Sequence, residues 1–240
     1  MDVTKYIEQL SQKIRNSAWK VEWMEKHSPY LYLPGPDSAP RLYLSTGIHG
    51  DEPAGPMVVL SMLEDNSFFR HLEVHLFPLL NPFGLAVGTR ENGDGVDLNR
   101  NYGPHPVAAR ETERHIEILQ SLPQMDVGIC LHEDWEASGV YLYHLDSSMQ
   151  RFQGRAVLDA MAHHLPVETA CVIDGSNAND GVIARHESEY ESEEWPESIF
   201  LCRTKTGASM TLETPSSAKL HQRMRAHQAG VAEVIRQLLR

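Results

Sequence analysis

The chain has few of the features that mark several protein classes, beginning with cysteine. Its 240 residues contain three cysteines, Cys130, Cys171 and Cys202, which stand far apart within or beside apolar stretches. An odd number of widely spaced cysteines favours buried thiols in a reducing compartment over a disulfide framework. The sequence has no CxxC pair, so it does not predict a zinc ribbon.

The sequence also predicts neither a membrane-spanning segment nor a targeting segment. No stretch approaches the roughly 20 consecutive apolar residues that a transmembrane helix needs. The first residues, 1–5, do not form a basic region followed by an apolar one, so we expect no signal peptide. We therefore expect a cytoplasmic protein that does not act at a membrane.

Positive charge is scarce in this chain. Lys and Arg number 21 against 33 Asp and Glu, which gives a formal net charge of −12. Binding to DNA or RNA needs clustered Lys and Arg, so a nucleic acid is not an expected partner. The hydrophobic content of 41% is ordinary for a globular enzyme. The length fits one domain over residues 1–240.

Predicted strands alternate with predicted helices along the chain. From apolar periodicity, the expected helices are 3–15, 54–65, 108–121, 148–164 and 217–239. The expected strands are 20–24, 30–33, 41–45, 73–80, 126–131, 140–144, 169–173 and 208–213. This alternation predicts an α/β domain with a mixed, largely parallel twisted sheet flanked by helices.

Two histidines and a glutamate could together hold a metal ion. His49 and Glu52 form an H-x-x-E pair on a loop whose glycines, Gly47 and Gly50, let the backbone bend. His132 follows eighty residues later at the end of another predicted strand. Taken singly, each of these residues would more often be an ordinary polar residue at a strand end than a metal ligand. Together they supply three zinc ligands and leave a fourth position open, as in catalytic zinc sites.

Other polar residues are placed to complete a hydrolytic site. Arg90 and Arg100 could hold an anionic substrate, and Glu213 could act as a general base. Glu213, like the three candidate ligands, lies at or just past the end of a predicted strand. Ligands of α/β sheets bind outside these carboxyl ends. Three candidate metal ligands, two arginines and a candidate base are together typical of a metal-dependent hydrolase.

The order of these motifs resembles the zinc metallocarboxypeptidase family. The motifs are HGDE at 49–52, GVDLNRNY at 95–102, LH at 131–132 and LET at 212–214, and GVDLNRNY is the most specific. The relatives of that family include murein-peptide amidases and the succinylglutamate desuccinylase/aspartoacylase group. The resemblance implies a zinc carboxypeptidase-like, phosphorylase/hydrolase-like fold. It also implies one Zn²⁺ held by His49, Glu52 and His132, and it leaves a second metal open.

The resemblance further implies roles for the residues around the metal. Asp97 matches a carboxylate that orients the first metal histidine, a contact that fixes the imidazole tautomer. Arg90 matches an arginine that polarises the scissile carbonyl, and Glu213 matches the catalytic glutamate. Asn99 and Arg100 match the pair that grips the terminal carboxylate of a substrate. Tyr190, by approximate position alone, is a candidate substrate contact.

These matches predict a zinc-dependent peptidase that hydrolyses the C-terminal amide bond of a small peptide. The alternatives are a deacylase that acts on acylated amino acids and a catalytically silent zinc- or peptide-binding protein. Two acidic segments, 133–136 and 187–194, depart from the family pattern. Segment 133–136 could bind a second cation, select a cationic substrate or face solvent, and we favour solvent exposure. Segment 187–194 is typical of an exposed acidic loop, which would favour a basic or amine-bearing group if it overhangs the site.

Overall fold

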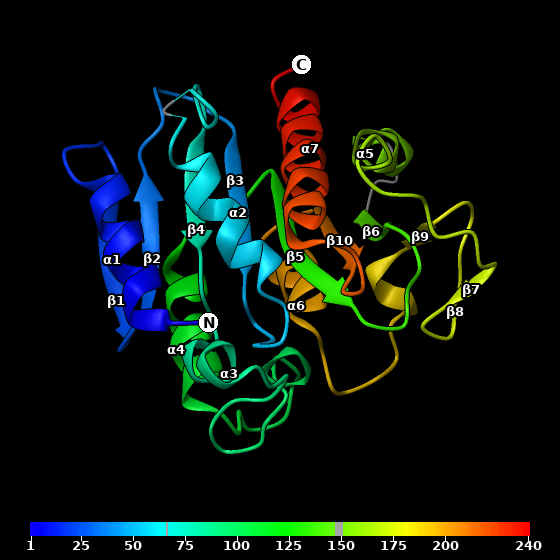
Figure 1. Ribbon diagram of the computed structural model, residues 1–240, viewed down its shortest axis with the longest axis horizontal. Coiled ribbons are helices and arrows are strands. Elements are labelled where there is room, and N and C mark those ends of the chain that lie inside the picture. Colours follow the sequence, from blue (N-terminus) through cyan, green and yellow to red (C-terminus); the bar gives the residue numbers. More distant parts are fainter. Residues whose placement is uncertain (66, 147–150) are drawn as a thin grey trace.

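An eight-stranded mixed sheet lies at the centre of the computed structural model, which describes residues 1–65, 67–146 and 151–240 (Figure 1). The strands lie side by side in the order β1-β2-β4-β3-β5-β10-β6-β9. Their bounds are β1 (Lys20–Glu25), β2 (Ser28–Leu33), β3 (Arg41–Thr46), β4 (Glu73–Phe77), β5 (Val127–Asp134), β6 (Tyr141–Asp146), β9 (Val182–Arg185) and β10 (Ala208–Pro215). A separate hairpin consists of β7 (Val172–Ile173) and β8 (Ser176–Asn177).

The four central strands run parallel to one another. β3 pairs in parallel with both β4 and β5, and β5 pairs in parallel with β10. The outer pairs β1/β2, β2/β4 and β10/β6 are antiparallel, whereas β6 and β9 are parallel. The predicted mixed, largely parallel sheet is therefore confirmed. The carboxyl ends of β3, β5 and β10 meet at one edge, where α/β sheets bind their ligands.

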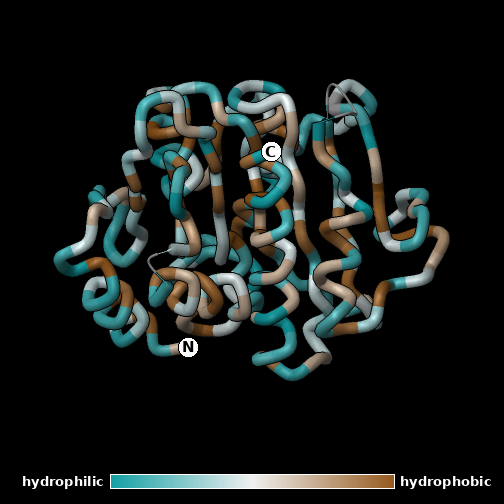
Figure 2. Tube along the Cα trace, turned by 90° about the horizontal axis from the view of Figure 1, so that it is seen from above, coloured by the Kyte–Doolittle hydropathy of each residue, from teal (hydrophilic) through white to brown (hydrophobic). Residues whose placement is uncertain are grey.

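Helices cover both faces of this sheet. α1 (Val3–Ile14), α2 (Ala54–Met62) and α7 (Leu220–Leu238) lie in front of it in Figure 1, and α5 (Gly154–Met161) packs against α7. α4 (Arg110–Ser121) and α6 (Glu197–Thr204) lie behind it. Viewed from above, hydrophobic segments concentrate between these layers (Figure 2).

Apolar residues of a single strand supply the core on both faces. Leu42 and Leu44 of β3 are fully buried in a cluster with α1, α2, α5 and α7. Tyr43, which lies between them, points the other way into a cluster with α4 and α6. Successive strand side chains alternate between faces, so a strand covered on both sides is apolar almost throughout. This is why β3 and β5 could be recognised from the sequence.

Two predicted elements differ from the structure because a helix cap and a hairpin turn went unrecognised. The strand expected over 73–80 ends at Phe77, and α3 (Pro82–Val87) follows it. The Asn81 side chain caps α3 by accepting a hydrogen bond from the Gly84 N–H. The strand expected over 169–173 is reduced to β7, because both residues of the Asp174-Gly175 turn have positive φ and reverse the chain.

Three further elements need correction. The helix expected over 148–164 begins at Gly154 as α5, and residues 148–150 lie outside the described residues. α6 and β9 were not expected from the sequence, since both are short.

The prediction that all three cysteines are buried is wrong for Cys171, which is exposed in the segment that precedes β7. No disulfide joins the three cysteines. Among the described residues, no helix is long and apolar enough to cross a membrane.

Candidate metal centre and active-site cavity

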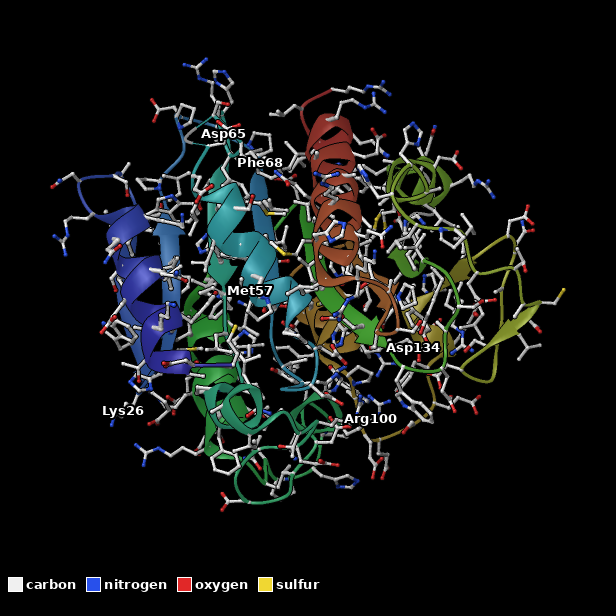
Figure 3. All side chains as sticks on the ribbon, in the orientation of Figure 1. Lys26, Met57, Asp65, Phe68, Arg100 and Asp134 are labelled. Carbon is white, nitrogen blue, oxygen red and sulfur yellow. The ribbon has the colours of Figure 1, made fainter. Side chains whose placement is uncertain are left out.

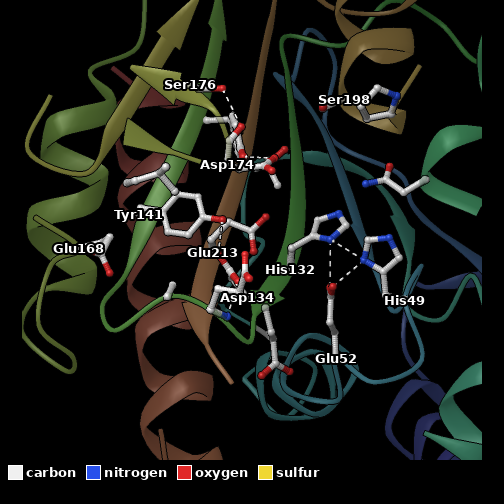
Figure 4. A pocket seen from close by; sticks show the side chains of 18 of the residues that line it. His49, Glu52, His132, Asp134, Tyr141, Glu168, Asp174, Ser176, Ser198 and Glu213 are labelled. Carbon is white, nitrogen blue, oxygen red and sulfur yellow. Dashed lines mark hydrogen bonds and ion pairs between the residues drawn. The ribbon is translucent and has the colours of Figure 1, made fainter. Parts of the chain in front are cut away.

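Three buried side chains converge at the carboxyl edge of the sheet. His49 and Glu52 follow β3, and His132 lies near the end of β5. His49 Nδ1 is 2.5 Å from one oxygen of Glu52, and His132 Nδ1 is 3.0 Å from the other. The two Nδ1 atoms are 3.2 Å apart. Figure 4 shows the three side chains pointing toward one another.

This arrangement has the donor set and the spacing of a metal site. Ligands on tetrahedral zinc lie about 3.3 Å apart when each bond is about 2.0–2.1 Å long. Both imidazoles present a nitrogen to the same point, and Glu52 Oε2 is buried without a well-aligned hydrogen bond from the described residues. A cation at this point could be bound by the two facing nitrogen atoms and the Glu52 carboxylate together. A zinc ion therefore fits the three side chains.

The loop that carries His49 and Glu52 turns tightly because of two glycines. Gly47 has a φ of +62°, in the left-handed region that disfavours other residues. A Cβ at Gly50 would lie 1.8 Å from the backbone carbon of Gly84 in α3, so only glycine fits there. The loop therefore packs directly on α3, and this contact aims both metal-facing side chains inward.

Asn81, which the sequence reasoning did not identify, ties this loop to the next one. Its fully buried amide donates hydrogen bonds to the carbonyls of Ile48 (3.3 Å) and Arg90 (3.2 Å). Its carbonyl oxygen meanwhile caps α3 through Gly84. One side chain thus fixes the backbone beside His49 relative to the backbone of Arg90. The Asn-Pro pair at the start of α3 was the available signal.

Asp97 and Arg90 contact the metal-facing residues from one side. His49 Nε2 lies 3.3 Å from Asp97 Oδ1, so Asp97 occupies the position expected of the orienting carboxylate. Arg90 Nε donates to Asp97 Oδ2 (3.0 Å), and Arg90 Nη1 is 3.8 Å from Glu52. The Asn99 backbone N–H also donates to Asp97 (2.9 Å). The GVDLNR segment is therefore anchored to the metal-facing histidine.

The electrostatics of this cluster favour a cation. Burial opposes protonation of His49, but the Glu52 and Asp97 carboxylates outweigh it and raise the pKa of His49 to about 9. Burial also opposes ionisation of Glu52, yet His49 and His132 hold its pKa below the usual range. Both effects reflect unlike charges in a site with little solvent. An incoming metal would have to displace the proton of His49.

Glu213 lies directly beside His132. The two residues are register partners on the parallel strands β10 and β5, so their side chains project from the same face of the sheet. Glu213 is 8% exposed, and this burial raises its pKa to about 8 despite the attraction of His132. A carboxyl group that titrates near neutrality can accept and release a proton during a reaction.

The structure places the three expected substrate-binding residues along one cavity. Asn99 is buried, and its side-chain oxygen accepts a hydrogen bond from the Glu197 N–H at the start of α6 (2.9 Å). Arg100 is exposed and donates to the Asn99 carbonyl (2.9 Å). Tyr190 also lines the cavity, but its hydroxyl donates to the Glu194 carbonyl (3.1 Å) on the acidic loop.

The cavity has a volume of about 810 Å³ and extends from the metal-facing residues to the β7–β8 hairpin. Arg100 and Asp134, which approach it from different segments, both lie toward the carboxyl edge of the sheet, whereas Asp65 lies at the opposite edge (Figure 3). Thr211 and Tyr143 contribute to the lining from β10 and β6. The cavity is large enough for a small peptide or an acylated amino acid.

The two acidic segments behave differently. Glu133 is buried, in contrast to the solvent exposure that we favoured for its segment. One of its oxygens accepts a hydrogen bond from the Ala54 N–H at the start of α2, and the other pairs with Arg223 of α7. Asp134 accepts a hydrogen bond from the Tyr141 hydroxyl (2.9 Å). Residues 188, 189 and 191–194 of the second segment are exposed, as expected.

Residues 38–228 match the succinylglutamate desuccinylase/aspartoacylase catalytic domain family. The chain belongs to this family. The resemblance to zinc metallocarboxypeptidases and their relatives is thereby confirmed, since this family is one of those relatives. The matched range contains every residue assigned to the site, from His49 to Glu213.

Curated relatives of this family member include peptide hydrolases. Murein peptide amidase A of Escherichia coli (strain K12) is 35% identical over 78 residues, which cover 31% of each chain. A probable carboxypeptidase 2 of Arthroderma benhamiae is 26% identical over 147 residues, which cover 50% of this chain and 27% of that protein. The matches thus span less than a third of the length of these relatives.

Solved structures share the fold over nearly the whole chain. A candidate metallopeptidase from Shewanella amazonensis SB2B has a TM-score of 0.86 and 25% identity, with coverage of 99% of this chain and 93% of that one. Carboxypeptidase A from Helicoverpa armigera has a TM-score of 0.68 and 13% identity, with coverage of 99% and 72%. These likenesses confirm the predicted zinc carboxypeptidase-like fold.

Proposed function

We propose that this protein is a zinc-dependent hydrolase that cleaves the C-terminal amide bond of a small peptide. The observation that carries the proposal is the register of Glu213 with His132 at the edge of the cavity. A buried carboxyl group of raised pKa thus lies next to three side chains that suit zinc. A binding protein would need the metal ligands but would have no use for such a base.

Several residues of the chain would each have a separate role in hydrolysis. Bound zinc would polarise the scissile carbonyl and lower the pKa of the attacking water. Glu213 accepts the proton of that water and delivers it to the leaving nitrogen. Arg90, held by Asp97, faces the metal ligands and stabilises negative charge on the carbonyl oxygen. Arg100 and Asn99 bind the terminal carboxylate and orient the substrate.

A second candidate function is the removal of an acyl group from an amino acid. The family match favours it, because the family is described by a desuccinylase and an aspartoacylase. The carboxypeptidase and amidase names of the curated relatives favour the peptidase function instead. Both reactions hydrolyse an amide beside a free carboxylate, so the same zinc ligands, Arg90 and Glu213 would serve either.

Mass spectrometry of the zinc-loaded protein with a mixed substrate panel tests this proposal. The panel contains small peptides with varied C-terminal residues and a matched set of N-acyl amino acids. We expect loss of a single C-terminal residue from at least one peptide, and none with metal-free protein. Cleavage of N-acyl amino acids alone would move the assignment to a deacylase. Zinc binding with no cleavage anywhere in the panel would contradict the hydrolase proposal.

A further inference from the structure

Residues 134–138 form a rim of the active-site cavity next to the candidate base, and we call them the rim segment. They belong to the connection from β5 to β6. These two strands lie on either side of β10, so the connection crosses the carboxyl end of β10. Asp134 is the register partner of Pro215, two residues beyond Glu213, and Tyr141 is the partner of Glu213 itself (Figure 4). The rim segment therefore lies beside Glu213, toward the carboxyl edge of the sheet.

Trp135 of the rim segment is unusually exposed for an aromatic residue. It is 78% exposed, more than any other large apolar side chain among the described residues. Indole has a large apolar surface, and water contact forfeits the free energy that burial would provide. Trp135 lines the cavity, so its exposed surface adjoins the candidate active site. A ligand in the cavity is therefore placed to cover it.

Hydrogen bonds hold the rim segment on both sides of this indole. Asp134 accepts from the Tyr141 hydroxyl (2.9 Å) and from the Glu136 N–H (2.7 Å). The backbone N–H and the hydroxyl of Ser138 donate to Glu168 (2.9 and 2.8 Å). The backbone that carries the indole is thus fixed before any ligand binds. A surface fixed in this way loses less conformational entropy on binding.

Further apolar side chains line the cavity beyond the indole. Ala137 of the rim segment packs in one cluster with Tyr141 of β6 and Ile173 of β7. All three line the cavity, and so does Val172, which is 58% exposed. The connection from β5 to β6 and the β7–β8 hairpin therefore present apolar area in the same cavity.

The charges of the rim segment are all negative. It contains Asp134 and Glu136, has no Lys or Arg, and contacts a third carboxylate at Glu168. A carboxylate on the neighbouring part of a substrate would be repelled by these groups. An uncharged apolar group meets no such repulsion and covers the indole. The rim therefore suits an uncharged apolar group.

The rim lies where the acyl side of a substrate has to pass. Only the released residue can be enclosed, with its carboxylate at Asn99 and Arg100, whereas the rest of the chain must reach solvent. The start of α6 holds Asn99 and lies over β3, where the Glu197 carboxylate accepts a hydrogen bond from Tyr43. The rim segment crosses β10, on the other side of β5 from β3. The acyl side therefore passes from the metal-facing residues along the rim.

We propose that Trp135 is a specificity residue that binds an uncharged aromatic or large apolar group on the acyl side of the scissile amide. This inference rests on the proposed function and names its substrate class. An aromatic ring would pack against the indole and bury part of its exposed surface. A succinyl group, which the name of the matched family mentions, would instead bring a carboxylate to the acidic rim.

The test compares dipeptides of the form N-acetyl-X-Y, with X as Phe, Ala or Glu, in the presence of the zinc-loaded protein. The released residue Y is held constant at the one that the substrate panel shows to be cleaved fastest. We expect kcat/KM to be about 5- to 30-fold higher for Phe than for Ala, from the apolar area buried. Glu should be cleaved more slowly than Ala. Trp135→Ala should reduce the Phe/Ala ratio to below about twofold.

The Phe/Ala ratio is the readout because a general loss of activity lowers both of its terms. Trp135→Phe keeps an aromatic face and should retain about half of the wild-type ratio or more. Trp23→Ala is the matched control, because Trp23 is also exposed (48%) but lies on the edge strand β1, outside the cavity. This control should keep the wild-type ratio. Equal cleavage of the Phe and Ala dipeptides by the wild-type protein would overturn the inference, as would a full ratio in Trp135→Ala.

A binding measurement distinguishes failure of this inference from failure of the proposed function. Calorimetric titration of the zinc-loaded protein with N-acetylphenylalanine and N-acetylalanine, the two acyl products, does not depend on turnover. Binding of N-acetylphenylalanine that is about fivefold tighter or more, and that is lost in Trp135→Ala, would support the subsite even if no amide were cleaved. Cleavage without preference, combined with equal binding, would overturn the subsite and leave the hydrolase intact. Equal binding without any cleavage would contradict both.

Discussion

His132 and Glu213 are register partners on the neighbouring parallel strands β5 and β10. The sheet alone therefore fixes the relation between a candidate metal ligand and the candidate base, which are 81 positions apart in the sequence. Side chains on rigid strands keep their separation better than side chains on loops. The backbone hydrogen bonds of the sheet thus hold the candidate base beside the candidate metal ligand His132.

The first prediction concerns this carboxylate. Glu213→Gln should lower kcat by about 10²- to 10⁴-fold, because the amide cannot accept the proton of the attacking water. Zinc content should remain at the wild-type level, since Glu213 is not among the three clustered candidate ligands. Activity and zinc content are measured on the same samples. Full activity of the variant would remove Glu213 from the mechanism.

The second prediction concerns the buried pair beneath the site. Arg223→Met should lower the free energy of unfolding by about 3–5 kcal/mol, because it leaves the buried Glu133 carboxylate without a counter-charge. Adding Glu133→Gln to that variant should restore part of the loss, since no buried charge then remains. The surface pair Arg236–Glu233 is the control, and Arg236→Gln should lower the free energy of unfolding far less than Arg223→Met does. Urea unfolding measures all four proteins.

A double variant no more stable than Arg223→Met would show that Glu133 does not need its counter-charge. Glu133 also accepts a hydrogen bond from the Ala54 N–H at the start of α2. Glutamine keeps an acceptor for that contact, so the comparison isolates the charge. The pair explains why an acidic residue follows His132 without facing solvent.

The third prediction is a pH dependence of stability that arises at His115. This residue is fully buried between the hydroxyls of Tyr43 (2.9 Å) and Tyr102 (2.7 Å), and burial lowers its pKa to about 3. Below its ordinary pKa of about 6.5, the unfolded chain binds a proton that the folded chain excludes. The stability that depends on neutral His115 is therefore fully present above about pH 6.5, and it is lost as the pH falls toward 3. A drop to about pH 4.5 should cost about 2–3 kcal/mol.

His115→Gln isolates this effect. The variant has no imidazole to protonate. The change in its free energy of unfolding between about pH 7.5 and pH 4.5 should therefore be about 2–3 kcal/mol smaller than the change in the wild-type protein. The loss of its hydrogen bonds lowers stability at both pH values and cancels in the difference. Urea unfolding at the two pH values gives this difference. Equal pH dependence of the two proteins would show that burial does not perturb His115.

The parts of the site that the sequence predicted are those fixed by local motifs at strand ends. His49 and Glu52 share one glycine-containing loop, and β5 leads directly to His132, so the apolar strands and their polar ends gave the positions. The part of the cavity lining that comes from Arg185 and the β7–β8 hairpin could not be placed in this way. It depends on β9 and on a hairpin whose Asp-Gly turn was the unrecognised signal.

The contacts of Glu133 and Asn99 were beyond sequence reasoning for a different reason. Arg223 is ninety residues from Glu133, and Glu197 is ninety-eight residues from Asn99. Nothing local in the chain indicates which partner a buried polar group will find, because tertiary packing decides it. The burial of Glu133 follows from α7 lying against β5, which only the folded chain reveals.

Titration of metal-free protein with zinc, while amide cleavage is followed, tests the central claim most directly. If His49, Glu52 and His132 hold one hydrolytic zinc, activity should rise in proportion to added zinc and level off at one equivalent. His132→Ala should neither bind that equivalent tightly nor gain activity. Wild-type protein that binds one zinc through these residues and cleaves no amide, or cleaves amides equally well without metal, would contradict the account.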